Sequence, residues 1–467
     1  MKRIIDEHIK NRLNEYDERY ENQSFKFLLI KGMRQIGKTY SIKKALNLNL
    51  IDAYPYYKGE KEEINFSFSS LCIDFSIDVS IIELIKNSYS GKDLIKNLKL
   101  DYRFKDLNLE FNDNHKLILF FDEIQLDIEG ILLSKIRTFI REKNIIFILS
   151  GSMLGVTALS HNFTPLGDSL TLIMHELTFK EYLYALGYDD NFLNGISNLI
   201  KDGKQVPEST HLELIRIFKD YIYTGGLPEV VKNFIKEGEE KAFEIQKNLL
   251  NGFIVDIAKY APSEVKIKSL KTFSAVATSL SRENTKFIYK DIDKNASKSR
   301  YENTIEWLLN GGYIVKASLL KTLDTGLIFD IDDSSFKLYY SSNSILTPQI
   351  GNNESKELIN SKSIHKGLVY ENIFASILNS LNPLDDNKIY YYSKKTGLEI
   401  DFVTKIKGKT VAIEVKSSEN TKSKSLSTIL NNNKDILGIR FSPKQAGRKD
   451  NLYSLPYYSV AFLDKII

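Results

Sequence analysis

A glycine-rich segment near the N-terminus has the residue types and spacing of a phosphate-binding loop. It matches the pattern G-x-x-x-x-G-K-[ST] without deviation. In such a loop, backbone N–H groups surround phosphate oxygens, the lysine neutralises the β and γ phosphates and the hydroxyl ligates Mg²⁺. ATP and Mg²⁺ are therefore the expected cofactors. The residues expected to contact the nucleotide are Gly32, Met33, Arg34, Gln35, Ile36, Gly37, Lys38, Thr39 and the adjacent Tyr40.

Two adjacent carboxylates follow an apolar run at residues 116–121. Asp122 at the tip of this predicted strand would hold the Mg²⁺ shell together with Thr39. Glu123 would polarise the attacking water as general base. A buried strand that stops at two acids by chance is the alternative, and the loop upstream makes it the weaker one. The pair predicts hydrolysis as well as binding, with Lys38 and Glu123 as catalytic residues.

A third predicted strand, residues 145–149, ends at Ser150 and Ser152. A hydroxyl at this strand tip would reach the γ-phosphate or the water, and a merely polar strand end explains the two serines equally well. Ser150 is kept as a nucleotide-binding candidate.

The elements that must position these residues alternate between strands and helices. Strands are expected at 25–31, 71–75, 116–121 and 145–149, and helices at 40–46 and 131–141. This alternation predicts an α/β fold with a parallel sheet that is covered on both faces.

A second set of charged residues lies near the C-terminus. A helix is expected near 366–380, followed by strands at 389–393, 398–404 and 410–415. Alternate side chains of a strand share a face, so Glu414 and Lys416 would point the same way. A neighbouring strand would bring Asp401 beside them, and Glu371 on a preceding helix would complete the set. Asp401 and Glu414 would hold Mg²⁺, and Lys416 would stabilise developing charge. An exposed strand with alternating charges is the alternative, and retained cleavage is left open.

With these residues in place, the chain resembles the prokaryotic AAA-type ATPases that carry a C-terminal nuclease-like domain. The C-terminal cluster looks like the core of the PD-(D/E)xK nuclease fold. The stretches that carry the resemblance are 32–39, 120–125, 150–152, 177–183, 223–231, 367–372 and 399–403.

The resemblance and the element pattern together divide the chain into five parts. A P-loop parallel sheet is followed by a helical lid, a winged-helix-like middle domain and a C-terminal α/β restriction-endonuclease-like domain. The expected ranges are 1–165 for the ATPase core, 166–262 for the lid, 263–345 for the middle domain, 346–363 for a linker rich in Asn, Ser and Gly, and 364–467 for the nuclease-like domain.

The chain departs from the family pattern in two places. The family usually has Gly-Arg before the Leu-Thr-Phe motif, whereas this chain has Gly167 and Asp168. Arg137 and Arg141 are candidate substitutes, although a solvated helix face explains both. Hydrolysis is then expected to be slow or to depend on a partner's arginine. The second departure places Ser341 and Ser342 where the family tends to have an aspartate.

Composition narrows the class of protein further. The chain has 467 residues, a formal charge of +4 and one cysteine, Cys72. A single cysteine excludes a disulfide framework and cysteine-based metal clusters. We see no signal peptide and no apolar run of membrane-spanning length, so a cytoplasmic protein without a membrane partner is expected.

The local charge of two regions makes DNA a candidate partner. Residues 394–450 contain thirteen Lys or Arg against six Asp or Glu. Such an excess could follow a phosphate backbone, and a solvated lysine-rich surface explains it equally well. In the middle region, Lys298 and Arg300 would open a recognition helix if the winged helix is correct. Winged helices also serve protein contacts, which leaves this reading open.

The expected function is therefore an ATP-hydrolysing AAA-type protein whose nucleotide state controls a DNA-directed, nuclease-like C-terminal module. The alternative is a nucleotide-gated regulator or scaffold whose C-terminal domain binds DNA or protein without cleavage. A homo-oligomer is a candidate assembly, because AAA-type sites are often completed by a neighbour's arginine. The DNA structure, the pathway and the oligomeric state stay open.

Overall fold

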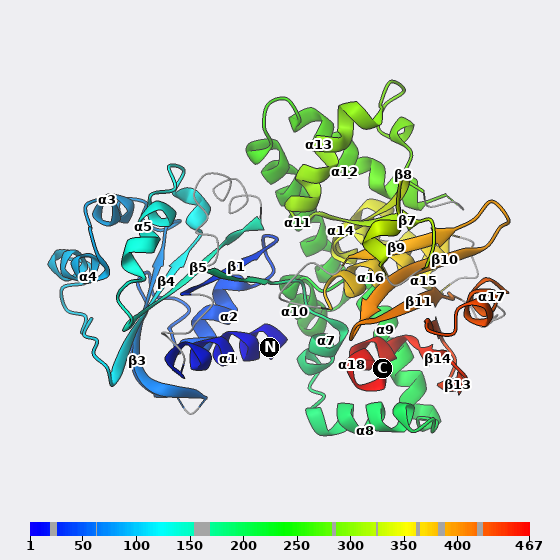
Figure 1. The fold of residues 1–467 in the computed structure, drawn as a ribbon, viewed down its shortest axis with the longest axis horizontal. Helices are drawn as coiled ribbons and strands as arrows, with labels where there is room; N and C mark the ends of the chain where they lie inside the picture. The colour runs from blue at the N-terminus through cyan, green and yellow to red at the C-terminus, as the bar shows by residue number, and fades with distance from the viewer. Residues whose placement is uncertain are drawn as a thin grey trace. The chain divides into compact units, whose positions relative to one another are not determined.

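The chain folds into two units in the computed structural model, one comprising Lys2–His175 and the other the residues from Glu176 onward. Figure 1 shows the first unit in blue and cyan and the second in green to red. The structure describes residues 1–18, 26–61, 63–153, 169–282, 286–323, 326–360, 365–381, 388–417 and 424–467.

The first unit is built on a six-stranded sheet in the order β2-β3-β4-β5-β1-β6. All neighbours pair in parallel except β2, which is antiparallel to β3. The four strands expected from the sequence are confirmed as β1, β3, β4 and β5. The strands are β1 (Phe27–Gly32), β2 (Tyr56–Lys61), β3 (Ile64–Asp74), β4 (His115–Asp122), β5 (Ile145–Ser152) and β6 (Ser169–Ile173).

Helices cover both faces of this sheet, as expected. On β4, Leu117, Leu119 and Phe121 join the core beneath α3, α4 and α5, while Ile118 and Phe120 are equally buried on the opposite side. Burial on both sides explains why β4 reads as a continuous apolar run. The helices are α1 (Ile4–Glu18), α2 (Lys38–Ala45), α3 (Ile81–Lys86), α4 (Gly91–Leu100), η2 (Ile124–Leu126) and α5 (Ile131–Phe139).

The second unit begins with a helical segment that confirms the helical reading of residues 176–260. Further helices follow along the chain, and α16 confirms the helix expected near 366–380. The helices up to the middle region are α7 (Phe179–Ala185), α8 (Asp190–Lys201), α9 (Glu208–Thr224), α10 (Pro228–Glu237), α11 (Glu239–Tyr260), α12 (Lys266–Leu280), η3 (Tyr289–Asp291), α13 (Lys298–Asn310) and η4 (Leu327–Asp330). The later helices are α14 (Asn343–Ile350), α15 (Asn352–Asn360), α16 (Lys366–Asn379), α17 (Lys424–Asn432), η5 (Tyr457–Phe462) and α18 (Leu463–Ile466).

An eight-stranded mixed sheet forms the rest of the second unit, in the order β13-β14-β12-β11-β10-β9-β7-β8. The strands are β7 (Ile314–Leu320), β8 (Ile331–Tyr340), β9 (Ile389–Ser393), β10 (Glu399–Ile406), β11 (Lys409–Val415), β12 (Leu437–Ser442), β13 (Gly447–Lys449) and β14 (Leu452–Pro456). The strands expected at 389–393, 398–404 and 410–415 are thereby confirmed.

This sheet differs from the expected separation of a middle domain, 263–345, from a C-terminal domain. β7 pairs in parallel with β9, from Ala317 opposite Ile389 to Leu320 opposite Tyr392. The β7–β8 hairpin therefore extends the C-terminal sheet, and the two expected domains share one layer of strands. Backbone pairing between distant segments leaves no local signal in the sequence, which is why the shared sheet was not predicted.

The segment expected as a linker, 346–363, is helical over its described part, because α14 and α15 together cover 343–360. Two of its polar residues, Thr347 and Ser355, are buried and hydrogen-bonded, and so is Asn343 just before it. Asn343 donates to the backbone oxygens of Ile222 (2.8 Å) and Val369 (3.1 Å). Residue types that are typical of loops therefore form buried hydrogen bonds here. Residues 361–364 lie outside the described part of the chain.

Candidate functional site

The phosphate-binding loop joins the end of β1 at Gly32 to the start of α2 at Lys38. A side chain at Gly32 would place its Cβ 2.4 Å from the backbone oxygen of Met174, so only glycine fits. Met33 and Ile36 are buried, Arg34 is half-buried, and Gln35 and Tyr40 are exposed. The loop is therefore anchored by the apolar side chains of Met33 and Ile36.

Lys38 is buried within this loop, with 6% of its surface exposed. Its ammonium donates to the backbone oxygens of Gly32 (3.2 Å) and Met33 (3.0 Å). Burial lowers the pKa of Lys38, and the nearby charges of Glu123 and Asp122 oppose that shift. A buried ammonium held by backbone carbonyls gains stability from an anion beside it, which a nucleotide phosphate would supply.

Asp122 is fully buried and accepts two hydroxyl hydrogen bonds. Thr39 Oγ1 donates to Oδ2 at 2.5 Å, and Ser150 Oγ donates to Oδ1. Burial raises the pKa of Asp122, while the bonds from Ser150 and Thr39 lower it. The strand order explains the convergence, because β5 lies between β1 and β4. A carboxylate and a hydroxyl that meet next to the loop are a donor set that fits Mg²⁺.

Glu123 adopts a left-handed backbone conformation, with φ of 52°. Its carboxylate accepts a hydrogen bond from the side-chain amide of Gln125, whose Oε1 in turn accepts from the backbone N–H of Ser152 at 3.1 Å. Gln125 therefore ties the expected general base to the tip of β5. Sequence reasoning missed Gln125, although its place two residues after Glu123 is a signal that could have found it.

Arg3 is a second residue that the sequence did not reveal. It is buried, and its guanidinium donates to the backbone oxygens of Ile36 (2.9 Å) and His175 (2.8 Å). These bonds brace the loop from the N-terminal segment. Nothing in the local sequence around Arg3 indicates this contact.

The arginines considered as substitutes are not part of this arrangement. Arg137 on α5 and Arg141 just after it are exposed. Gly167 and Asp168, where the family pattern has Gly-Arg, lie outside the described residues.

The C-terminal cluster is placed by α16, β10 and β11. β11 lies between β10, to which it is antiparallel, and β12, to which it is parallel. Glu414 Oε1 lies 2.7 Å from Lys416 Nζ, and its other oxygen lies 3.6 Å from Nε of Arg440. Asp401 Oδ2 accepts from the backbone N–H of Val415 at 2.8 Å.

Lys337 on β8 is the residue that sequence reasoning missed in this cluster. It is 1% exposed, and its ammonium lies 3.1 Å from Glu399 and 3.8 Å from Glu371. Burial alone would lower the pKa of Lys337, but the neighbouring carboxylates raise it. Burial, followed by the charge of Glu371, raises the pKa of Asp401 to about 7.

The carboxylates of this cluster do not fit a divalent cation. Glu414 faces two side-chain cations, Glu371 faces Lys337, and Asp401 is bonded to the backbone. Among the residues that the structure describes, no three His, Cys, Asp or Glu side chains are grouped as ligands of a metal ion. The expected Mg²⁺ ligation by Asp401 and Glu414 therefore finds no support in the geometry, because side-chain cations lie beside the carboxylates of Glu414 and Glu371. Glu414 Oε2 is itself buried without a hydrogen-bond partner.

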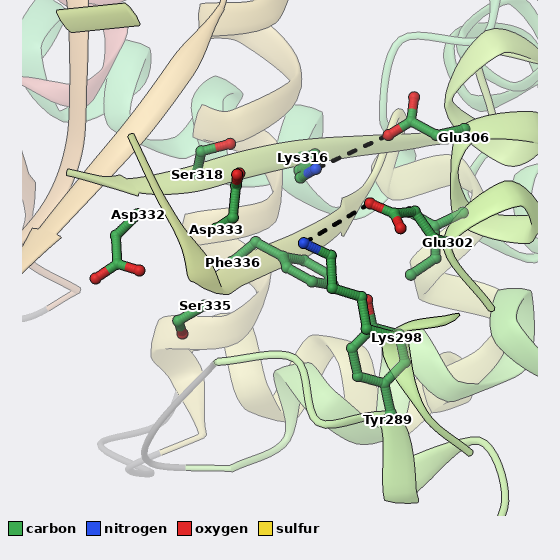
Figure 2. A pocket seen from close by; sticks show the side chains of 11 residues that line it. Tyr289, Lys298, Glu302, Glu306, Lys316, Ser318, Asp332, Asp333, Ser335 and Phe336 are labelled. Atoms are coloured by element: carbon green, nitrogen blue, oxygen red, sulfur yellow. Dashed lines mark ion pairs between the residues drawn. The ribbon is translucent and has the colours of Figure 1, made fainter. Parts of the chain in front are cut away.

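The expected recognition helix is α13, and Figure 2 shows the pocket between it and the β7–β8 hairpin. Lys298 pairs with Glu302, and Lys316 pairs with Glu306, each at 3.8 Å. Two further carboxylates on the hairpin, Asp332 and Asp333, also line the pocket. This lining has more negative than positive charge and opposes a DNA phosphate backbone. Arg300 is exposed at the start of the helix.

Three family models match the chain, each over part of it. Residues 24–183 match an AAA domain. Residues 215–356 match a domain of unknown function, DUF8612, and residues 366–458 match another, DUF4143. The N-terminal part is therefore similar to AAA domains, a class of P-loop domain that binds and hydrolyses nucleoside triphosphates. No curated protein matches the sequence.

Solved structures with similarity to the chain share little sequence with it. The Aeropyrum pernix ORC2 protein, solved as ADPNP and ADP complexes, is 12% identical, with 79% of this chain and 94% of that chain covered and a TM-score of 0.33. The Cdc6p of Pyrobaculum aerophilum is 12% identical, with 78% and 95% covered and a TM-score of 0.24.

Proposed function

We propose that the chain is a Mg²⁺-dependent ATP hydrolase whose nucleotide state controls a DNA-directed C-terminal module. The observation that carries the proposal is the contact between Thr39 and Asp122 beside the buried Lys38. A loop hydroxyl, a strand-tip carboxylate and a buried ammonium in one place are what Mg²⁺-nucleotide binding requires.

Each residue has a distinct role in this proposal. Lys38 balances the charge of the β and γ phosphates, and Thr39 and Asp122 hold Mg²⁺. Bound Mg²⁺ would neutralise charge on the phosphate oxygens. Glu123 accepts the proton of the attacking water, and Ser150 keeps Asp122 in place through its hydrogen bond. Gln125 orients Glu123.

The proposal that the C-terminal module is directed to DNA rests on the charge of that module. Residues 394–450 carry thirteen Lys or Arg against six Asp or Glu. Lys405, Lys407 and Lys409 are exposed on the hairpin that joins β10 to β11. Exposed lysines favour contacts with a phosphate backbone, and such contacts weaken with salt. The Lys407 ammonium also donates to the backbone oxygen of Asp464. The acidic pocket beside α13 is not part of this surface.

The test of hydrolysis uses two substitutions in the first unit. Lys38→Ala removes the buried ammonium and should abolish ATP binding, measured by titration calorimetry. Glu123→Gln keeps the size of the base but not its charge. It should therefore bind ATP while turnover falls about 10²- to 10⁴-fold, the usual contribution of a general base.

Matched controls are available on the same unit. Lys86→Ala removes an exposed lysine of α3, and Glu129→Gln removes an exposed carboxylate six residues beyond the base. Both should bind and hydrolyse ATP as the unmodified chain does. Normal turnover by Glu123→Gln would show that the base is misassigned, and unchanged ATP affinity of Lys38→Ala would remove the nucleotide site itself.

A further inference from the structure

We propose that Lys337 takes the place of a divalent cation in the C-terminal carboxylate cluster, so that this module acts on its partner without metal and without cleaving DNA. The inference goes beyond the proposed ATP hydrolysis, because it concerns the second unit alone. It selects the non-cleaving form of the C-terminal module.

Lys337 lies on β8, within reach of carboxylates from other elements of the second unit. β8 is the strand next to β7 at one edge of the sheet, and its Lys337 ammonium reaches Glu399 at the start of β10 and Glu371 on α16. Asp401 lies close enough for its charge to act on the same ammonium. One side-chain cation thus pairs with Glu371 and Glu399 and acts on Asp401, on which the charge of Glu414 also acts.

Burial fixes this cation in place. Lys337 is 1% exposed, and its ammonium also lies 5.1 Å from the centre of the Tyr391 ring. A buried lysine is stable only with paired negative charge, and here the carboxylates supply it. Lys416, by contrast, keeps 30% of its side chain exposed and can move. Lys337 cannot leave the cluster without burying an uncompensated charge.

The cluster as a whole contains nearly as many side-chain cations as carboxylates. Four carboxylates, Glu371, Glu399, Asp401 and Glu414, meet three cations, Lys337, Lys416 and Arg440. Mg²⁺ and Mn²⁺ need several oxygen ligands that are free of other cations. A divalent ion placed here would lie beside a fixed positive charge, and the ligands that remain would not compensate it.

The test measures metal binding directly in the nucleotide-free full-length chain. Mn²⁺ is titrated and followed by electron paramagnetic resonance. An Asp122→Asn substitution in every sample removes the metal ligand of the nucleotide site, so that the signal reports only on the second unit. Lys337→Met is compared with the unmodified cluster, because methionine fills a similar volume without charge.

We expect the unmodified cluster to leave Mn²⁺ free in solution. Lys337→Met should bind one Mn²⁺ at least about tenfold more tightly, and a further Asp401→Asn should abolish that binding. Mn²⁺ should also raise the melting temperature of Lys337→Met and not that of Lys337→Arg, which keeps the positive charge.

Several results would overturn the inference. One is Mn²⁺ binding by the unmodified cluster that disappears with Asp401→Asn. Another is a folded Lys337→Met protein that gains no affinity for Mn²⁺. Mn²⁺-dependent DNA cleavage that Asp401→Asn abolishes would do the same. If Lys337→Met does not fold, the titration of the unmodified cluster decides, since binding there contradicts the inference and its absence supports it.

Discussion

At the scale of single residues, the hydrogen bond between Gln125 and Glu123 allows the positioning of the general base to be tested separately from the action of the base itself. Gln125→Ala would leave the Glu123 carboxylate without its donor. A hydrogen bond to a charged group contributes about 1.5–3 kcal/mol, so kcat for ATP should fall about ten- to hundredfold. The KM for ATP should change little, because Gln125 does not belong to the phosphate loop. Steady-state kinetics measures both.

A second substitution distinguishes positioning from general loss of structure. Gln125→Glu keeps an acceptor for the backbone N–H of Ser152 but places a like charge beside Glu123. A like charge favours the protonated carboxyl, so the acid limb of the kcat–pH profile should move to higher pH. An unmoved profile together with normal kcat in Gln125→Ala would mean that Gln125 has no positioning role.

Some functional residues could be located from the sequence and others could not. The two groups differ in whether their contacts are local in the sequence. The loop from Gly32 to Thr39 and the pair Asp122 and Glu123 are contiguous motifs, so residue type and spacing were enough to locate them. Arg3 and Lys337 act through tertiary contacts with residues 33 and more positions away. No spacing rule connects such residues, and only the fold brings them together.

At the scale of elements, the Gly225–Gly226 turn between α9 and α10 explains one of the motifs that the sequence singled out. The backbone N–H of Gly226 donates to Glu176 at 2.8 Å, and its oxygen accepts from Leu177 at 2.8 Å. Glu176 also accepts from Ser376 on α16 at 2.9 Å. The turn therefore links the helical segment to the C-terminal part of the second unit.

Gly226→Ala tests this packing. Its Cβ would lie 2.2 Å from the backbone oxygen of Leu177, which cannot move without breaking the turn. Overpacking of this kind costs about 1–3 kcal/mol, so denaturant unfolding of the second unit should shift to lower concentration.

Gly195→Ala on α8 is the matched control, because a Cβ there meets nothing within 4 Å. This helical position should gain about 0.5–1 kcal/mol from the same substitution. Equal effects of the two substitutions would remove the packing role assigned to the turn.

Elements were predictable where their apolar pattern is local. β1, β4 and β5 are buried runs whose ends coincide with motifs, and their order along the chain predicted a parallel sheet. The helices at 343–360 were not predictable, since Thr347 and Ser355 are buried polar groups in a stretch whose composition is typical of a linker. The joining of β7 to β9 was not predictable either, because strand pairing across about seventy residues has no local pattern.

At the scale of the whole molecule, the chain combines a unit similar to AAA domains with a second unit that has its own sheet and its own buried charge cluster. None of the helices among the described residues combines the length and apolar character needed to cross a bilayer. The proposed control requires that the nucleotide bound to the first unit changes what the second unit binds. Such coupling between two sites is typically about 1–3 kcal/mol.

The affinity for DNA in two nucleotide states tests this control most directly. Glu123→Gln with ATP should hold the ATP state, and Lys38→Ala should stay free of nucleotide at the same ATP concentration. We expect the dissociation constants for a labelled duplex, measured by fluorescence anisotropy at fixed salt, to differ by at least about fivefold. Equal affinity in the two variants, or no DNA binding by either, would contradict nucleotide control of a DNA-directed module.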